Sequence, residues 1–359
     1  MYGDRRGVHR GRRPIRPSRV RRLSRPRDRS DHGIGGPGHG QRHGHLRLDS
    51  PGFHRGKPGP PGNAPRAGAD VRIIAMALVT DQEIEAFWRD GVAVVRGVLS
   101  DDTLASMAKP VERALGSEAM NNMTEMGAMV VPPSGGTVLN DPTASKRGAP
   151  RGQFHGGTDH WWDDTDFEAF ATRSPLPQLA AELMKSRELW FYEDSVLVKE
   201  PHTEEPTSIH QDMAYFQLEG EKVCTTWCPL DPISKETGAT VYVKGSHRWE
   251  RNFRPNWFVS QLSMPNTDGE EVPHYDRDDA EHLLCFDMEP GDVAVHHAMT
   301  LHGAHANVSD QWRRAISVRY CGDDTVYRFK RGTPLKPHHS EVTEGDPVDH
   351  PRCPQVWPR

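Results

Sequence analysis

The sequence contains residue types at a spacing that suits a metal site. A histidine and an acidic residue two positions apart lie on the same side of a β-strand, so both side chains can bind one metal ion. The 359 residues include 20 histidines and 50 acidic side chains, and chance placement alone gives about three such pairs. The pattern therefore needs support from its context. The candidate pairs are His210 with Asp212, His274 with Asp276, and His339 with Glu341.

The surroundings favour the first of these pairs. His210 follows a long apolar segment and a turn that contains Pro201 and Pro206. The residues after Asp212 are compatible with an extended strand. His274 lies instead in an acidic tract typical of a solvated loop, and the third pair lies in a proline-rich tail. We therefore expect His210 and Asp212 to be the metal ligands.

A third ligand would have to come from a distant segment. His302 has the best surroundings, because it closes an apolar segment and precedes Gly303. Three protein ligands on octahedral Fe(II) leave three positions open, two for a bidentate 2-oxo acid and one for dioxygen. Arg313, at the head of another predicted strand, could bind the distal carboxylate of 2-oxoglutarate through two parallel hydrogen bonds. The histidines available in this region are His296, His297, His302 and His305.

The elements that would position these residues are mostly short strands. Thr80 and Glu83 match a capping box and predict a helix over residues 80–90, and apolar spacing predicts helices over 100–115 and 176–185. From Met120 to about Pro150 the pattern indicates a long loop. Several short strands without regular intervening helices favour a sandwich or barrel with helices packed outside it. The predicted strands are 92–99, 189–199, 223–229, 239–243, 292–297 and 315–320.

The first 75 residues differ in composition from the rest of the chain. They contain 18 basic and five acidic side chains, whereas the remaining residues contain 27 basic and 45 acidic ones. With Tyr2 and Phe53 as their only aromatic residues, they cannot bury enough apolar surface to fold, and we predict that they are disordered. A nucleic-acid-binding arm and a targeting peptide are two explanations of this segment. We favour a third, in which translation begins at Met76 and a single domain spans residues 76–359 with an irregular tail from about residue 324.

Composition also excludes some classes of protein. The net charge of the whole chain is −5, and no segment approaches the roughly 20 consecutive apolar residues that cross a bilayer. Five cysteines, an odd number, argue against a disulfide scaffold, and Cys224 and Cys228 are most simply buried thiols of the core. We expect a cytoplasmic protein with a small-molecule substrate and no membrane or nucleic-acid partner. The sequence does not indicate an oligomeric state.

Four ordered blocks of sequence resemble the phytanoyl-CoA dioxygenase family of Fe(II)- and 2-oxoglutarate-dependent oxygenases. The resemblance extends from about Leu78 to Asp323, and its specificity lies in the order of the blocks. It implies a mainly β protein with flanking helices, folded as a double-stranded β-helix, or jelly roll, of the cupin-like kind. The blocks are His210-Gln-Asp-Met-Ala-Tyr-Phe, Thr226-Trp-Cys-Pro-Leu-Asp231, Glu236-Thr-Gly-Ala239 with Lys244-Gly-Ser-His-Arg248, and Leu301-His-Gly303 through Asn307 to Arg313-Arg-Ala315.

The resemblance also implies roles for particular residues. It makes His210, Asp212 and His302 the iron ligands and assigns the distal carboxylate of 2-oxoglutarate to Arg313. Relatives often have a serine two residues after the distal histidine, where this chain has Ala304, so we expect either a lower affinity for 2-oxoglutarate or another donor such as Thr300 in its place. Further residues implied for the cosubstrate pocket are Gln211, Trp227 and Lys199.

The reaction implied is an oxidation that consumes dioxygen and 2-oxoglutarate and releases succinate and carbon dioxide. Related halogenases lack the carboxylate ligand, so the presence of Asp212 favours hydroxylation or desaturation of a small organic molecule. The loop over residues 120–150 and the segment 155–164, with Trp161 and Trp162, could cover the mouth of the site. Nothing in the sequence marks a surface for coenzyme A. Two other functions stay open, a non-catalytic jelly-roll binding protein and a cupin-type metalloenzyme that does not use 2-oxoglutarate.

Overall fold

The first helix follows directly from its capping residues. In the computed structural model, α1 runs over Asp81–Asp90. The Thr80 hydroxyl accepts a hydrogen bond from the backbone N–H of Glu83, and the Glu83 carboxylate accepts one from the backbone N–H of Thr80. Gly91 ends the helix in the left-handed conformation, at a φ of 87°. The predicted capping box and helix are therefore confirmed.

The structure describes residues 77–129 and 151–358. The predictions for residues 1–75 and for Met76 lie outside these ranges. In the described part of the chain, no helix is long and apolar enough to cross a membrane.

The next helical segment is divided into two helices where the sequence predicted one. Ser100 caps α2 (Asp101–Ser106) by accepting a hydrogen bond from the backbone of Thr103, and α3 (Ala108–Leu115) follows after a break. A continuous helix would require an N–H group at Pro110 to bond to the carbonyl of Ser106. Proline has no such group, so the break before it has a direct physical cause.

The described beginning of the predicted long loop is not a loop. Residues Met120–Asn122 form β2 and residues Met123–Met129 form α4, whereas a loop was predicted from Met120 onward. β2 pairs antiparallel with β3 (Phe154–Thr158), so a partner about 35 residues further along the chain stabilises a strand that local propensity does not indicate. The Asn122 side chain accepts a hydrogen bond from the backbone of Glu125 at the start of α4. The rest of the predicted loop lies outside the described residues.

The larger antiparallel sheet provides one wall of the site. Among the described residues it has eight strands, in the order β1-β10-β7-β12-β4-β3-β2, with β14 paired to β4 beside this path. β4 (Leu189–Lys199) and β7 (Val223–Pro229) have the predicted bounds, but β1 ends before the turn at Gly97, where φ is 63°. The remaining strands are β1 (Val92–Val95), β10 (Val293–His297), β12 (Arg313–Gly322) and β14 (Gln355–Trp357).

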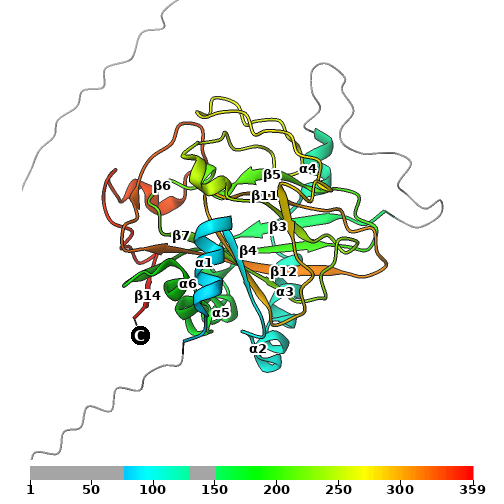
Figure 1. The fold of residues 1–359 in the computed structure, drawn as a ribbon, viewed down its shortest axis with the longest axis horizontal. Coiled ribbons are helices and arrows are strands. Elements are labelled where there is room, and N and C mark those ends of the chain that lie inside the picture. Colours follow the sequence, from blue (N-terminus) through cyan, green and yellow to red (C-terminus); the bar gives the residue numbers. More distant parts are fainter. Residues whose placement is uncertain (1–76, 130–150, 359) are drawn as a thin grey trace, which may run out of the picture. The chain divides into compact units, whose positions relative to one another are not determined.

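The smaller antiparallel sheet provides the opposite wall. Its four strands follow the order β5-β11-β8-β9, and Figure 1 shows β5 and β11 lying across from β4 and β12 of the larger sheet. Two antiparallel sheets around a buried interior, with helices outside, form the mainly β jelly roll that was predicted. The strands are β5 (Thr207–Gln211), β8 (Thr240–Val243), β9 (Leu283–Cys285) and β11 (Leu301–Ala304).

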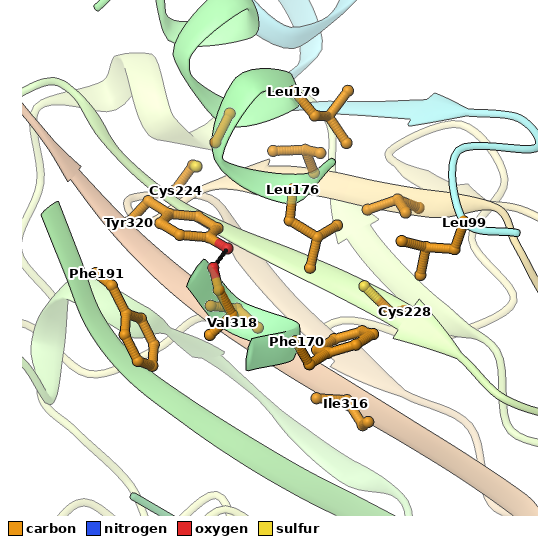
Figure 2. Packing of buried hydrophobic residues seen from close by; sticks show 14 of the residues in the cluster. Leu99, Phe170, Leu176, Leu179, Phe191, Cys224, Cys228, Ile316, Val318 and Tyr320 are labelled. Carbon is orange, nitrogen blue, oxygen red and sulfur yellow. Dashed lines mark hydrogen bonds between the residues drawn. The ribbon is translucent and has the colours of Figure 1, made fainter. Parts of the chain in front are cut away.

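Helices α5 (Thr165–Arg173) and α6 (Leu176–Met184) cover the outer face of the larger sheet. Figure 2 shows Leu176 and Leu179 of α6 above side chains from β7 and β12. The hydroxyl of Tyr320 donates a hydrogen bond of 2.6 Å to the carbonyl of Ala171 and joins the sheet to α5. The strand residues in this apolar cluster include Phe191, Val196, Val198, Cys224, Cys228, Val293, Val295, Ile316, Val318 and Tyr320.

The segment after residue 324, predicted as an irregular tail, contains three short elements and returns to the body of the fold. β13 (Val326–Tyr327) pairs with β6 (Leu218–Glu219), and β14 pairs with β4. Tyr327 and Cys353 are fully buried. The short 3-10 helices of the structure are η1 (His160–Trp162), η2 (Asp212–Ala214), η3 (Ser246–Trp249) and η4 (Pro337–Ser340).

Candidate metal and cosubstrate site

Two histidines lie side by side because their strands pair. His210 on β5 and His302 on β11 are register partners, and their ring centroids are 4.3 Å apart. Asp212 begins η2 directly after β5 and faces the same buried space. One ligand atom from each of these three residues lies within 4.8 Å of the other two, which brings together the predicted ligand set.

Backbone carbonyls orient both imidazoles. Nδ1 of His210 donates to the carbonyl of Ser208 at 2.8 Å, and Nδ1 of His302 donates to the carbonyl of Thr300 at 2.9 Å. A carbonyl oxygen only accepts, so Nδ1 carries the proton and Nε2 keeps its lone pair for a metal. Burial, followed by the neighbouring imidazoles, holds the pKa of His302 well below its usual range, which favours the neutral form that binds a metal.

Asp212 turns a different oxygen toward each side of the pocket. Its Oδ1 atom lies 3.4 Å from Nε2 of His210 and 3.7 Å from Nε2 of His302. Its Oδ2 atom accepts a 2.6 Å hydrogen bond from the Thr225 hydroxyl. Burial opposes ionisation, but the nearby imidazoles and Arg319 outweigh it and hold the pKa of Asp212 well below its usual range. The group is therefore a carboxylate, with Oδ1 facing the histidine nitrogens.

Arg313 is a buried cation for which the described residues provide no carboxylate partner in hydrogen-bonding range. Its side chain is 1% exposed, and neither Nε nor Nη1 has a hydrogen-bond partner in the described part of the chain. Burial lowers its pKa to about 10, so the guanidinium stays charged at neutral pH. Arg314, the neighbour with which it could be confused, binds Asp231 at 2.6 Å on the other side of β12. An unpaired buried guanidinium is costly, and a carboxylate ligand would remove that cost.

One narrow pocket between the sheets joins the three ligands to Arg313. Trp227 lines it, with its ring 5.7 Å from the guanidinium carbon of Arg313. Two imidazole nitrogens and one carboxylate oxygen suit Fe(II), and the unpaired guanidinium suits the distal carboxylate of 2-oxoglutarate. The residues present therefore fit both groups. Other residues that line the pocket include Thr207, Thr225, Thr240, Phe258, His296, Ala304, Ser317 and Arg319.

Gln211 does not line this pocket, contrary to the expectation from the resemblance. Its amide donates to the carbonyl of Met299 at 2.9 Å and to that of Arg251 at 3.2 Å, and its oxygen accepts from the backbone of Phe253. It lines a separate, larger cavity of about 940 Å³ that includes none of the three ligands. The reason is strand alternation, because a residue between two inward side chains must point outward.

Two further candidates have other partners in the structure. Lys199 is the register partner of Arg313, but its ammonium donates to the carbonyl of His305 at 2.6 Å, and it is not among the residues that line the pocket. The hydroxyl of Thr300 donates to the carbonyl of Gly91 at 2.9 Å. Thr300 therefore does not take the place of the serine that is missing at Ala304.

The competing sequence pairs do not join the ligand set. Among the described residues, His210, Asp212 and His302 form the one group with metal-ligand spacing, and it includes neither of the other candidate pairs. A further match in the sequence, His202 with Glu204, lies in the turn after β4 and is not part of it either. Cys224 and Cys228 are buried in the apolar cluster under the helices, as expected of core thiols.

Sequence reasoning did not assign roles to three polar residues beside the ligands. His296, Thr225 and Arg319 all lie near Oδ2 of Asp212, at 3.4, 2.6 and 4.0 Å. A signal was available, because Thr225 and Trp227 alternate on one strand, as do Arg313, Ser317 and Arg319 on another. His296 was among the possible third ligands, but its side of β10 depends on a register that the sequence does not specify.

A second cavity, of about 420 Å³, adjoins the ligands and shares Asp212, Phe258 and Arg319 with the pocket. Met123 and Met126, together with residues 156–159, line it, so both segments expected near the mouth contribute to it. The tryptophans of the second segment do not. Trp161 packs against Phe191 in the core, and Trp162 lies near Lys336 and Arg352.

The polar residues that line this cavity combine cations with carboxylates. The Lys336 ammonium lies 2.6 Å from Asp159 and 2.8 Å from Glu193. Arg319 donates a hydrogen bond of 2.5 Å to the hydroxyl of Ser195 and lies 3.7 Å from Glu193. Burial, followed by repulsion from Glu193, raises the pKa of Asp159 to about 6. The cavity is therefore lined by charged groups as well as by aromatic and methionine side chains.

The two-sheet architecture and the buried ligand set define a jelly roll with an internal metal-binding geometry. The chain belongs to the phytanoyl-CoA dioxygenase family, because the family model described as phytanoyl-CoA dioxygenase matches residues 87–315. The predicted enzyme class, a non-haem Fe(II)- and 2-oxoglutarate-dependent dioxygenase, is confirmed by this membership.

Individual relatives are distant in sequence. Peroxisomal phytanoyl-CoA dioxygenase from Rattus norvegicus is 24% identical over 263 residues, which cover 71% of this chain and 72% of that protein. A probable alpha-ketoglutarate-dependent hypophosphite dioxygenase from Stutzerimonas stutzeri is 30% identical over 128 residues, or 34% of this chain and 42% of that one. The solved structure of SnoK, a non-heme alpha ketoglutarate dependent carbocyclase from nogalamycin biosynthesis, has a TM-score of 0.56. It is 22% identical and covers 77% of this chain and 96% of its own, so it supports the fold alone.

Proposed function

We propose that this oxygenase hydroxylates or desaturates a small organic molecule, with His210, Asp212 and His302 as its iron ligands and Arg313 as the anchor of 2-oxoglutarate. The observation that carries the proposal is that three buried ligand atoms and one unpaired buried guanidinium face the same pocket. A purely structural role leaves the unpaired cation unexplained, whereas a dicarboxylate cosubstrate satisfies it.

Each residue has a defined task in this proposal. When bound, iron and 2-oxoglutarate supply the oxidising chemistry, in which dioxygen gives one oxygen atom to succinate and the other to the hydroxylated product while carbon dioxide is released. The carbonyl-bound imidazoles present Nε2 without reorganisation, because each Nδ1 is already bonded to the backbone. Arg313 orients the cosubstrate, and Trp227 beside it excludes water.

The 420 Å³ cavity is our candidate for the substrate-binding space. Its volume lies within the range of about 300–1,000 Å³ that is usual for small-molecule pockets. Apolar side chains such as Met123, Met126 and Trp257 would hold the body of the substrate. The Lys336, Asp159 and Glu193 group would bind its polar end. We infer a small molecule with both apolar and polar parts, whose hydrogen-bearing carbon lies next to Asp212.

The cosubstrate assignment is tested by anaerobic titration with Fe(II) and 2-oxoglutarate. The wild-type protein should develop the weak visible metal-to-ligand charge-transfer band of a bidentate 2-oxo acid on Fe(II). The Arg313→Met variant should bind iron normally but need about 100-fold more 2-oxoglutarate for the same band. Bound iron without any band would contradict the use of 2-oxoglutarate and favour a cupin-type metalloenzyme. A band without succinate release in air would favour a binding protein.

We further propose a cytoplasmic location. The five cysteines, Cys224, Cys228, Cys285, Cys321 and Cys353, are free thiols, and four of them are buried. Free thiols are the usual state of cysteines in a reducing compartment. Fractionation of cells that produce the full chain would test this location, and recovery of the protein with an oxidising compartment would contradict it.

A further inference from the structure

His296 is a buried imidazole beside the three proposed metal ligands, and the proposed function gives it no role. It is 1% exposed and lies on the inner side of β10, in register with Thr225 of β7. Its ring centroid is 4.2 Å from that of His302 and 5.4 Å from that of Tyr242. Neither ring nitrogen has a hydrogen-bond partner of normal geometry in the described part of the chain. A buried polar side chain in this situation needs a physical explanation.

The contacts of His296 differ from those of the metal-binding histidines. His210 and His302 each bond to a carbonyl through Nδ1, and their Nε2 atoms approach Oδ1 of Asp212. Nε2 of His296 lies instead 3.4 Å from Oδ2, the other oxygen of the same carboxylate. His296 is also not part of the group with metal-ligand spacing. The geometry therefore separates it from a fourth ligand and places it behind the carboxylate.

Thr225 approaches the same oxygen from the neighbouring strand. Its hydroxyl donates a 2.6 Å hydrogen bond to Oδ2 of Asp212. Because Thr225 and His296 are register partners on β7 and β10, the pairing of these two strands brings both groups to one atom. Unlike in His210 and His302, no carbonyl among the described residues holds the proton on Nδ1 of His296, so the neutral ring is free to carry it on Nε2, which faces Oδ2.

The number of carboxylate oxygens on the metal decides how many positions stay open. With one oxygen and two imidazoles bound, an octahedral ion has three free positions, which 2-oxoglutarate and dioxygen together require. If Oδ2 also bound the metal, one of these positions would be lost. Groups that hold Oδ2 away from the metal therefore keep these three positions free. Removing hydrogen-bond partners of a metal ligand typically changes the metal affinity by about 10- to 100-fold.

We propose that His296 is a positioning residue that, together with Thr225, holds Oδ2 of Asp212 and keeps this aspartate a one-oxygen metal ligand. The inference rests on the metal site of the proposed function, but it does not depend on the use of 2-oxoglutarate. It can therefore be tested with a metal ion alone.

The test is a titration with Co(II), whose visible spectrum reports the number and type of its ligands. His296→Phe keeps an aromatic ring and removes both nitrogens, and we expect about 10-fold weaker Co(II) binding with an altered visible spectrum. His296→Gln retains an N–H donor and should recover most of the affinity and the wild-type spectrum. Thr225→Val should act in the same direction as His296→Phe. The double variant should lose more than the product of the two single losses, because each group partly compensates for the other.

His297→Phe is the matched control. It is the next residue on β10, is also buried, and contacts the carbonyl of Glu221 rather than Asp212. Thermal unfolding of the metal-free proteins would verify that each variant is folded. Unchanged Co(II) affinity and spectrum in His296→Phe would overturn the proposal, and so would equal losses in His297→Phe. Wild-type protein that binds Co(II) but gives no charge-transfer band with Fe(II) and 2-oxoglutarate would overturn the cosubstrate assignment alone, whereas a failure to bind Co(II) would overturn both.

Discussion

The two faces of the larger sheet are both buried, but along β12 they differ in chemistry. On β12, Ile316, Val318 and Tyr320 point to the helices and join an apolar cluster (Figure 2). The alternate residues Ser317 and Arg319 point to the interior between the sheets and line the pocket. Burial alone therefore does not distinguish core from site. On β12, what distinguishes them is whether the face has buried polar atoms that the described residues leave without a partner.

This difference separates stability from function within single strands. The outer face has few polar atoms that a ligand could bind. It stabilises the fold because its apolar area is removed from water. The inner face keeps a buried guanidinium at Arg313 that the protein leaves partly unpaired, which costs stability unless a ligand is present. Substitutions at neighbouring residues of one strand should therefore change different measured quantities, either the free energy of unfolding or the activity and cosubstrate binding. The substitutions with the largest expected effects test this most directly.

Loss of a ligand should have the largest effect. His302→Ala removes one of the three proposed metal ligands and leaves the outer face unchanged, so we expect succinate formation to fall by about 10³-fold or more. Iron retained after dialysis and succinate formed in air are the measurements. His305→Ala, a change at a half-buried histidine on the same segment, is the matched control. Iron binding that survives in His302→Ala would mean that the ligand set is incorrectly assigned.

The adjacent arginines of β12 provide the second comparison. Arg313→Met should raise the KM for 2-oxoglutarate by about 100-fold, because a buried carboxylate–guanidinium contact is lost. Arg314→Met removes a partly exposed salt bridge to Asp231 and should change the free energy of unfolding by less than about 1 kcal/mol, with no change in KM. Steady-state kinetics and urea denaturation separate the two outcomes. Equal effects on KM would show that the faces of β12 are not functionally distinct.

Substitution on the outer face should show the reverse pattern. Ile316→Ala creates a cavity under the helices and should lower the free energy of unfolding by about 2–5 kcal/mol. The KM for 2-oxoglutarate of the remaining folded enzyme should not change, because Ile316 does not line the pocket. Ser317→Ala, one residue further on, should alter the KM for 2-oxoglutarate with little effect on the free energy of unfolding. A large loss of stability in Ser317→Ala would contradict this division.

Elements with strong local signals were predictable from the sequence. α1 has its capping box and its terminal glycine, and β4 and β7 are rich in β-branched and aromatic residues and bounded by turn residues, so their bounds were predicted correctly. β2 and the break after α2 were not, because a distant strand stabilises the first and one proline causes the second. Local propensity contains no information about a partner about 35 residues away.

The site was predictable in its residue types but not in the direction of each side chain. The spacing of His210 and Asp212 indicated one side of a strand, and the structure brings both beside His302. Gln211 was expected in the pocket although the same alternation places it outside. His296 could not be distinguished from its three histidine neighbours without the register of β10 against β7.

Asp194 is an exception on the outer face, and it gives the smallest expected effect. It is 1% exposed and is the register partner of Val318. Burial, followed by the nearby Asp159, raises its pKa from 3.8 to about 7 in the folded protein. Between about pH 4 and pH 7 the folded state therefore binds more protons at this group than the unfolded state, so stability must fall as pH rises through that range.

Replacement of this carboxyl sharpens the comparison of the two faces. We expect Asp194→Asn to remove on the order of 2 kcal/mol of this pH-dependent loss, so the variant should be more stable than the wild type at pH 8 and nearly equal to it at pH 4. Urea denaturation at both pH values measures this difference. Glu193→Gln, on the inner side, is the matched comparison, because it alters the contacts to Lys336 in the cavity. If the Asp194→Asn advantage were the same at both pH values, ionisation would not be its cause, and the outer face would tolerate a charged carboxylate as readily as the inner face does.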